Sequence, residues 1–155
     1  MENISAHITY KEATKSDTAI RLGIENEPNE YQLSKMKALA NTIFEPTRLH
    51  FGKPIKVSSF FRSEELNSAV GGSSTSQHIR GEAMDIDNDG SSPTNREIFD
   101  YIKDNLVFDQ LIFEGGTKEN PDWVHVSKKL EGVNRGQVLR MSYKKGKVIY
   151  ENYVP

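Results

Sequence analysis

The spacing of apolar residues in the first half of the chain indicates one long amphipathic helix. Between residues 31 and 51, apolar side chains recur every three or four positions, as they do on one face of a helix. Pro46 is expected either to kink this helix or to begin a second helix at Leu49, and Gly52 is expected to end it. Residues 1–30 are polar and poorly periodic, so we expect a lead-in that wraps the domain.

Four short segments later in the chain have the composition of β-strands. They are rich in β-branched, aromatic and other apolar side chains, and they comprise residues 53–61, 83–86, 109–113 and 123–127. Residues 63–70 predict a short helix that ends at Gly71 and Gly72. Thr94 and Glu97 have the spacing of a capping box, which predicts that another helix begins there.

The end of the chain predicts a hairpin, within residues 137–151, that turns at Lys145 and Gly146. Helices that precede most of the strands, with short connections between them, favour an α+β fold with an antiparallel sheet and helices packed on it. No internal repeat or change of composition divides the 155 residues. We therefore expect a single domain, with residues 1–30 as the lead-in and residues 53–127 as the motif-bearing core.

The composition narrows the classes of function. A chain that is 35% hydrophobic and 27% charged has a globular profile, and no apolar run approaches the ~20 residues that span a bilayer. A net charge of −2, with basic and acidic residues interspersed, argues against nucleic-acid binding. Cysteine is absent, so a zinc site would have to be built from His, Asp or Glu. We expect a monomer without a membrane or nucleic-acid partner.

Candidate chemistry is concentrated in residues 76–85, SQHIRGEAMD, where His78 and Asp85 lie seven positions apart. A third metal ligand is available at His125, in the apolar segment WVHVS. Two imidazoles and one carboxylate with an open fourth position form a catalytic zinc set in hydrolytic enzymes. A single histidine among apolar strand residues is more often a hydrogen-bonded core residue, so the assignment of His125 as a ligand depends on the complete pattern.

That complete pattern, SxHxxGxAxD followed by a strand with one Trp and one His, resembles the zinc D-Ala-D-Ala carboxypeptidases and L-Ala-D-Glu endopeptidases. Those peptidases belong to the wider LAS group of metallopeptidases, together with lysostaphin and the hedgehog signalling domain. The likeness extends to SFFRS at residues 59–63, VGGS at residues 70–73 and DQLI at residues 109–112. It implies a hedgehog-like fold, one zinc ion held by His78, Asp85 and His125, and hydrolysis of peptidoglycan stem peptides.

The resemblance leaves two candidates for the general base. Members of the group place a carboxylate either three residues before the last histidine, which matches Asp122, or at the end of the preceding strand, which matches Glu114. Glu114 is favoured because it would reach the metal if residues 109–113 pair with residues 123–127. Asp122 follows Pro121 in a polar turn, where Asp is common for conformational reasons alone.

Two further residues are substrate-binding candidates by resemblance. Arg62 would hold a substrate carboxylate through two parallel hydrogen bonds, although it could also be a surface residue paired with Glu64 or Glu65. Ser76 could donate a hydrogen bond to substrate or serve only in a turn. Trp123 could line a pocket, but a position in the core is the favoured interpretation.

The segment DIDNDG at residues 85–90 begins like a calcium-binding loop. Such a loop requires Glu at its twelfth position, which here is Arg96, and it requires a preceding helix, where this chain has glycine-containing sequence. Asp87 and Asp89 are therefore expected in a solvated turn, and a second bound cation there stays an open alternative.

The amino terminus has no basic start followed by an apolar stretch, which predicts synthesis in the cytoplasm without a signal peptide. The setting resembles that of a phage or prophage endolysin or virion enzyme that acts on the cell wall after release. A non-catalytic, zinc-bearing binding module on a hedgehog-like scaffold is the alternative function. Whether the enzyme would be a carboxypeptidase or an endopeptidase is left open.

Overall fold

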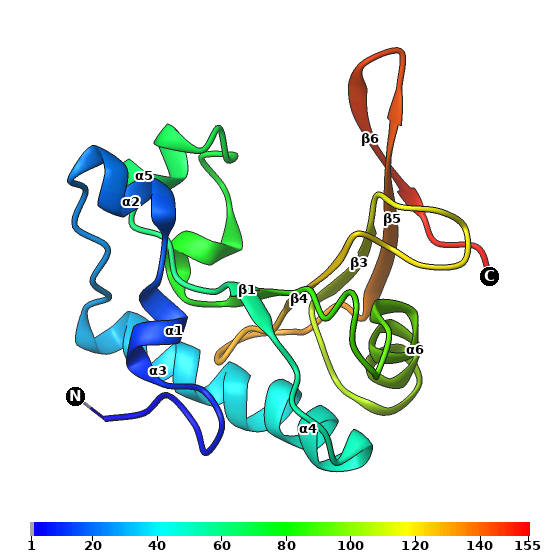
Figure 1. Ribbon diagram of the computed structural model, residues 1–155, viewed down its shortest axis with the longest axis horizontal. Coiled ribbons are helices and arrows are strands. Elements are labelled where there is room, and N and C mark those ends of the chain that lie inside the picture. Colours follow the sequence, from blue (N-terminus) through cyan, green and yellow to red (C-terminus); the bar gives the residue numbers. More distant parts are fainter. Residues whose placement is uncertain (1) are drawn as a thin grey trace.

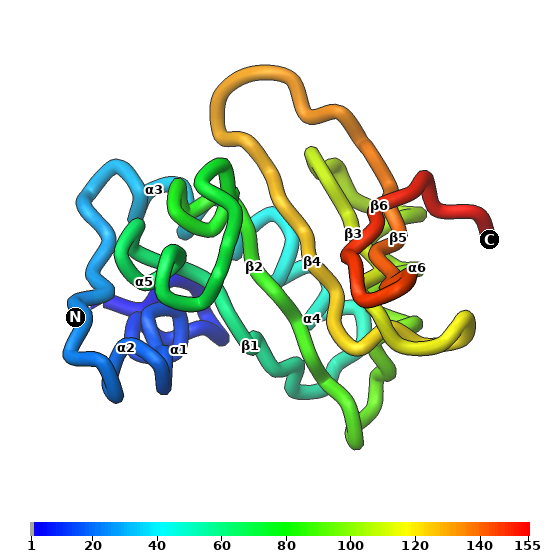
Figure 2. The backbone as a smooth tube through the Cα atoms, turned by 90° about the horizontal axis from the view of Figure 1, so that it is seen from above, coloured from blue at the N-terminus to red at the C-terminus, as the bar shows by residue number. Residues whose placement is uncertain are grey.

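A six-stranded mixed sheet organises residues 2–155, the part of the chain that the computed structural model describes (Figures 1 and 2). Its strands lie in the order β1-β2-β4-β3-β5-β6. They are β1 (Val57–Ser59), β2 (Ala83–Ile86), β3 (Gln110–Glu114), β4 (Trp123–Ser127), β5 (Gln137–Lys144) and β6 (Lys147–Asn152). The predicted α+β class is confirmed.

The sheet is mixed because β3 and β5 run parallel, whereas the other neighbouring strands are antiparallel. Strand β4 ends at Ser127, close to the start of β3, where the backbone N–H of Asp109 donates to the Ser127 carbonyl. Residues 128–136 then cross to the other side of β3, so that β5 starts beside Gln110 and follows the direction of β3. A purely antiparallel sheet was therefore the wrong expectation for this one pair.

The helices are α1 (Tyr10–Thr14), α2 (Asp17–Leu22), α3 (Glu30–Leu39), α4 (Glu45–Phe51), α5 (Glu64–Ala69) and α6 (Asn95–Asn105), with a π-helical turn η1 (Ala40–Phe44) and a 3-10 turn η2 (Gln77–Arg80). The predicted capping box at Thr94 and Glu97 begins α6. Two short capped helices, α1 and α2, occupy the segment that was expected only as a lead-in. Each is too short to show a helical period. None of the helices within residues 2–155 is long and apolar enough to cross a bilayer.

The predicted long helix is continuous from α3 through η1 to α4 and ends at Gly52, as expected. Its second part begins at Glu45 and not at Leu49. Proline has no N–H for the helical ladder, and the wide turn η1 lies where Pro46 interrupts that ladder.

One face of the sheet packs against α3, η1, α4 and α6, which lie together on one side of the strands in Figure 1. Alternate residues of the three central strands point to this face and are fully buried: Met84, Ile86, Leu111, Phe113, Val124 and Val126. Their helical partners include Met36, Leu39, Ile43, Phe44, Ile98, Phe99 and Ile102. Because side chains alternate along a strand, the residues between these positions face the opposite side.

The opposite face carries the polar residues of the motifs. Asp85 of β2, His125 of β4 and Ile112 of β3 lie side by side in one row across the sheet. Glu114 and Trp123 form the neighbouring row on this face, two residues after Ile112 in β3 and two residues before His125 in β4. The strand register therefore brings candidate residues from three separate segments onto one surface.

Candidate metal centre

Three potential metal ligands converge on the polar face of the sheet. His78 comes from η2, Asp85 from β2 and His125 from β4, and one ligand atom from each lies within 4.8 Å of the others. His78 and Asp85 are buried, while His125 is partly exposed. The structure thus brings together the three residues that the motif singled out.

Local structure explains how His78 reaches this point. The turn η2 ends at Gly81, whose backbone is in the left-handed region with φ 72°. A β-carbon at Gly81 would lie 2.7 Å from the backbone oxygen of Gln32 in α3, so only glycine allows the turn to approach the helix this closely. The Gln32 side chain completes the contact by donating to the Ile79 carbonyl at 3.0 Å.

The hydrogen bonds of the two histidines indicate which nitrogens are available to a metal. Nδ1 of His78 lies 2.7 Å from the carbonyl oxygen of Phe60, which can only accept, so Nδ1 carries the hydrogen. Nε2 of His78 is then left 3.3 Å from Oδ1 of Asp85. Nδ1 of His125 lies 3.1 Å from the same oxygen, and the Nε2 of His125 faces away from it.

Two imidazoles around one carboxylate suit a zinc ion. Burial would raise the pKa of Asp85, but the nearby imidazoles of His78 and His125 outweigh burial and hold that pKa well below its usual range. Asp85 is therefore ionised, as a metal ligand must be. Nitrogen and oxygen donors with a partly open side match the three-ligand pattern of catalytic zinc.

Glu114 lies next to this cluster and is only 6% exposed. Burial raises the pKa of Glu114 to about 7; nearby His125 lowers it, and the charge of Asp85 adds to the rise. A buried carboxyl group that titrates near neutral pH, beside a candidate metal site, has the properties of a general base.

Asp122 occupies a different environment. It is exposed in the turn between β3 and β4, and its Oδ2 accepts a hydrogen bond from the backbone N–H of Gly116 at 3.1 Å. Its backbone N–H in turn donates to the Glu114 carbonyl at 2.9 Å. The Asp122 carboxylate therefore stabilises the turn that connects the two strands.

Arg62 lies beside the ligands, with Nη2 3.6 Å from Oδ2 of Asp85. Arg62 also lines a hollow of about 190 Å³, together with Ser58 and Ser59 of β1. A larger cavity of about 410 Å³ lies between α1 and β1, and neither His78 nor His125 lines it. Arg62 thus contacts the ligand cluster and also lines the smaller hollow.

Ser76 caps its own turn, and Trp123 lies on the polar face of the sheet. The Ser76 hydroxyl accepts a hydrogen bond from the backbone N–H of His78 at 3.3 Å and so caps η2. Trp123 is half-buried on the same face as Glu114, and it is not one of the buried core residues. The favoured core position for Trp123 was therefore wrong.

The calcium-loop alternative does not fit the observed contacts. The side chain of Asp85 belongs to the histidine cluster, and the side-chain amide of Asn95 donates to both Asp87 and Asp89 at 3.1 Å. The same amide also lies within hydrogen-bond distance of the Pro121 and Asp122 carbonyls. Neutral N–H groups thus occupy the position between these carboxylates where a cation would bind.

Sequence reasoning missed the polar residues behind His125. Gln77 precedes a predicted ligand, and Asp109 begins a predicted strand, but neither received a role. Asp109 is completely buried, and the hydrogen bonds of its side chain come from Gln77 and Arg135, which are 32 and 26 positions away. The sequence signal that could have pointed to Asp109 was the presence of a charged residue at the start of an apolar strand.

A sheet face that holds two imidazoles, an ionised carboxylate and a buried glutamic acid defines a candidate mononuclear metallohydrolase. The family model described as Peptidase M15 matches residues 6–127. The chain therefore belongs to the Peptidase M15 family, a family of zinc metallopeptidases. No curated protein matches the sequence closely enough to count as a relative.

Proposed function

We propose that this peptidase hydrolyses peptide bonds in the stem peptides of bacterial peptidoglycan, with zinc held by His78, Asp85 and His125. The observation that carries the proposal is the position of Glu114, buried beside the ligand cluster on the same face of the sheet. A protein that only binds a partner has no need of a proton acceptor at that position.

The division of roles follows from the geometry. A zinc ion bound to the three ligands would polarise the scissile carbonyl and make a water molecule more acidic. Glu114 accepts the proton of the attacking water and returns it to the leaving amine. Burial raises the pKa of this carboxyl group, so its ionised form takes up a proton more readily than an ordinary glutamate does.

The substrate assignment rests on Arg62 and on the likeness of the motifs to wall-peptide hydrolases. Arg62 offers a planar guanidinium beside the ligands, and stem peptides carry free carboxylates that such a fork binds with two hydrogen bonds. Both a D,D-carboxypeptidase and an L-alanyl-D-glutamate endopeptidase would use this contact, so the proposal covers the two cleavage sites.

The test is digestion of defined muropeptides by the zinc-loaded protein, with the products identified by mass spectrometry. Glu114→Gln should retain zinc and lower turnover by about 10²–10⁴-fold, the usual contribution of a general base. Asp122→Asn, as the matched control, should have a much smaller effect. Loss of activity in the Asp122 variant with full activity in the Glu114 variant would reverse the assignment.

The same experiment distinguishes the alternative function. A wild-type protein that binds zinc but releases no product from any defined muropeptide would be a zinc-bearing binding module. Mass shifts also identify the cleaved bond, because removal of a terminal alanine and cleavage between alanine and glutamate leave fragments of different composition.

A further inference from the structure

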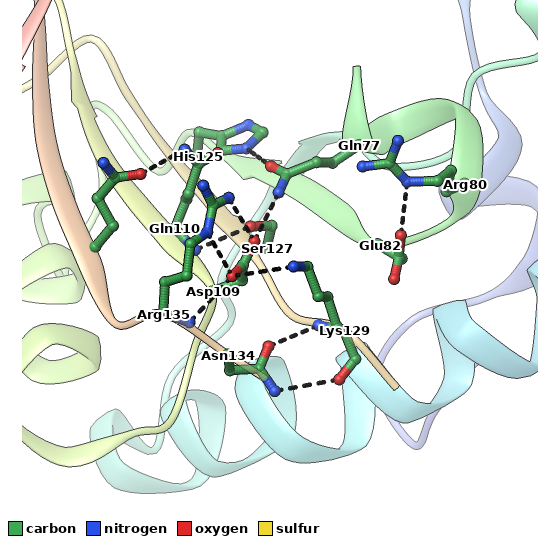
Figure 3. Close-up of polar contacts among 11 residues, drawn as sticks. Gln77, Arg80, Glu82, Asp109, Gln110, His125, Ser127, Lys129, Asn134 and Arg135 are labelled. Carbon is green, nitrogen blue, oxygen red and sulfur yellow. Dashed lines mark hydrogen bonds and ion pairs between the residues drawn. The ribbon is translucent and has the colours of Figure 1, made fainter. Parts of the chain in front are cut away.

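A chain of hydrogen bonds connects His125 through Gln77 and Asp109 to Arg135 (Figure 3). Nε2 of His125 lies 3.1 Å from Oε1 of Gln77, and Nε2 of Gln77 donates to Oδ2 of Asp109 at 3.1 Å. Asp109 is held in turn by Arg135, whose guanidinium donates to both carboxylate oxygens, at 3.0 and 2.8 Å. The chain thus connects a candidate ligand with a residue beyond the part matched by the family model.

The direction of each hydrogen bond in this chain is fixed by chemistry. Arg135 can only donate, and its two hydrogen bonds lower the pKa of Asp109, so Asp109 is ionised and can only accept. The amide nitrogen of Gln77 must therefore face Asp109, and its amide oxygen must face His125. An oxygen at that position requires the hydrogen of His125 to be on Nε2.

We propose that Gln77 and Asp109 are positioning residues that keep the hydrogen of His125 on Nε2 and direct its Nδ1 toward the metal. This inference rests on the proposed function, because it assumes that His125 is a ligand. A metal-bound histidine commonly donates its second N–H to a neighbouring acceptor, which orients the ring and makes it a stronger ligand. Here the acceptor is an amide whose orientation a buried carboxylate enforces.

The burial of Asp109 supports a dedicated role. Its side chain is completely buried, and an ionised carboxylate is costly to bury unless it is paired and fully hydrogen-bonded. Lys129 lies 3.9 Å from Oδ1, and the backbone N–H of Arg135 donates to the same oxygen. Asp109 therefore also anchors residues 129–135, and a test must separate this structural task from the orientation of His125.

The first measurement is the dissociation constant for zinc, determined by competition with a chelator. In Gln77→Met the side chain has a similar length but no amide group, so it loses the hydrogen bonds to both His125 and Asp109. This change should weaken zinc binding about 10- to 100-fold. The control is Arg80→Gln, which breaks the 2.7 Å contact of Arg80 with Glu82 and leaves the His125 chain intact. It should bind zinc as the wild type does.

The second measurement is the exchange of the His125 Nε2 hydrogen with water, followed by NMR on the zinc-loaded protein. It should exchange slowly in the wild type, because Gln77 accepts it, and fast in Gln77→Met. Asp109→Asn should show intermediate exchange, since an asparagine can present either its oxygen or its NH₂ group to Gln77. A residue that only stabilises the fold would alter thermal unfolding without this change in exchange.

The outcomes separate the two proposals. Wild-type zinc affinity and slow exchange in Gln77→Met would overturn the positioning role, even if the peptidase activity is as proposed. If His125→Ala bound zinc as tightly as the wild type, the assignment of His125 as a ligand would itself be overturned. If Asp109→Asn does not fold, Arg135→Lys tests the same carboxylate, because it preserves a charge but not the paired hydrogen bonds.

Discussion

The two faces of the central strands have opposite properties although their residues alternate along the same short segments. In β3, Phe113 points to the helices and is completely buried in an apolar core, where its ring contacts Phe99 edge to face. The next residue, Glu114, points to the other face and is almost as buried, but it is a carboxylic acid. One face stabilises the fold, and the other holds groups that are costly to bury.

The contrast shows how this domain supports a reactive site. The apolar face packs against long helices and supplies the stability, which allows the polar face to keep an ionised Asp85 and a Glu114 with a raised pKa. Predictions for the two faces should therefore differ in kind. Changes on the helix face should alter unfolding, and changes on the other face should alter metal binding, pH dependence or turnover.

The largest expected effect is loss of the metal. His78→Ala and His125→Ala should each bind far less than one zinc per chain and lose peptidase activity, because two remaining ligands hold zinc weakly. His50→Ala is the control, since His50 stacks on Tyr101 and lies outside the ligand cluster. Elemental analysis of the purified variants measures the zinc content. Full occupancy in either site variant would refute the assignment.

The next largest effect should come from the core. Phe113→Ala should lower the free energy of unfolding by about 3–5 kcal/mol, because it removes a completely buried aromatic ring and leaves a cavity. Denaturant titration of the metal-free protein measures this change. If the loss were below about 1 kcal/mol, the helix face would not be the main source of stability.

Glu114→Gln should change the stability of the metal-free protein in the opposite direction. The native carboxyl group stays protonated up to a pKa of about 7, whereas the ordinary value is 4.5, so the native state binds more protons between these limits. Stability should therefore fall as pH rises from about 4.5 to 7. The total loss of stability over this pH range is about 3 kcal/mol, because each unit of difference in pKa corresponds to about 1.36 kcal/mol.

Glu114→Gln removes this titration, so its unfolding free energy should rise relative to the wild type across the same pH range. Denaturant titrations at pH 5 and pH 8 provide the comparison. Asp122→Asn, at an exposed turn position, is the control and should not raise the unfolding free energy in this way. Parallel curves for the wild type and Glu114→Gln would show that Glu114 titrates normally.

The smallest effect should be on substrate recognition. Arg62→Ala should keep zinc and lower kcat/KM about ten- to a hundredfold, the equivalent of roughly 1.5–3 kcal/mol for a lost charge-assisted hydrogen bond. Arg62→Lys should recover only part of this, since an ammonium lacks the planar fork. Amidation of the substrate carboxylate should then impair the wild type much more than Arg62→Ala. An equal penalty in both proteins would assign Arg62 a structural role.

The sequence alone determined the local features of this protein. The strands at residues 83–86 and 123–127, the capping box at Thr94 and the stop at Gly52 depend on side chains within a few positions of each other, so short-range patterns predict them well. The ligand motif is also local for His78 and Asp85. Its resemblance to a peptidase family supplied His125, which no spacing rule could connect to the other two.

Only the tertiary structure decided which residues share a face with the ligands. The register of β3 against β4 places Glu114 beside His125 and leaves Asp122 in the turn, and the crossing by residues 128–136 makes β5 parallel to β3. The contacts of Asp109 with Gln77 and Arg135 join residues that are far apart in the chain. Such pairings depend on how complete helices and strands pack against each other, so the pattern of residues within any one segment does not predict them.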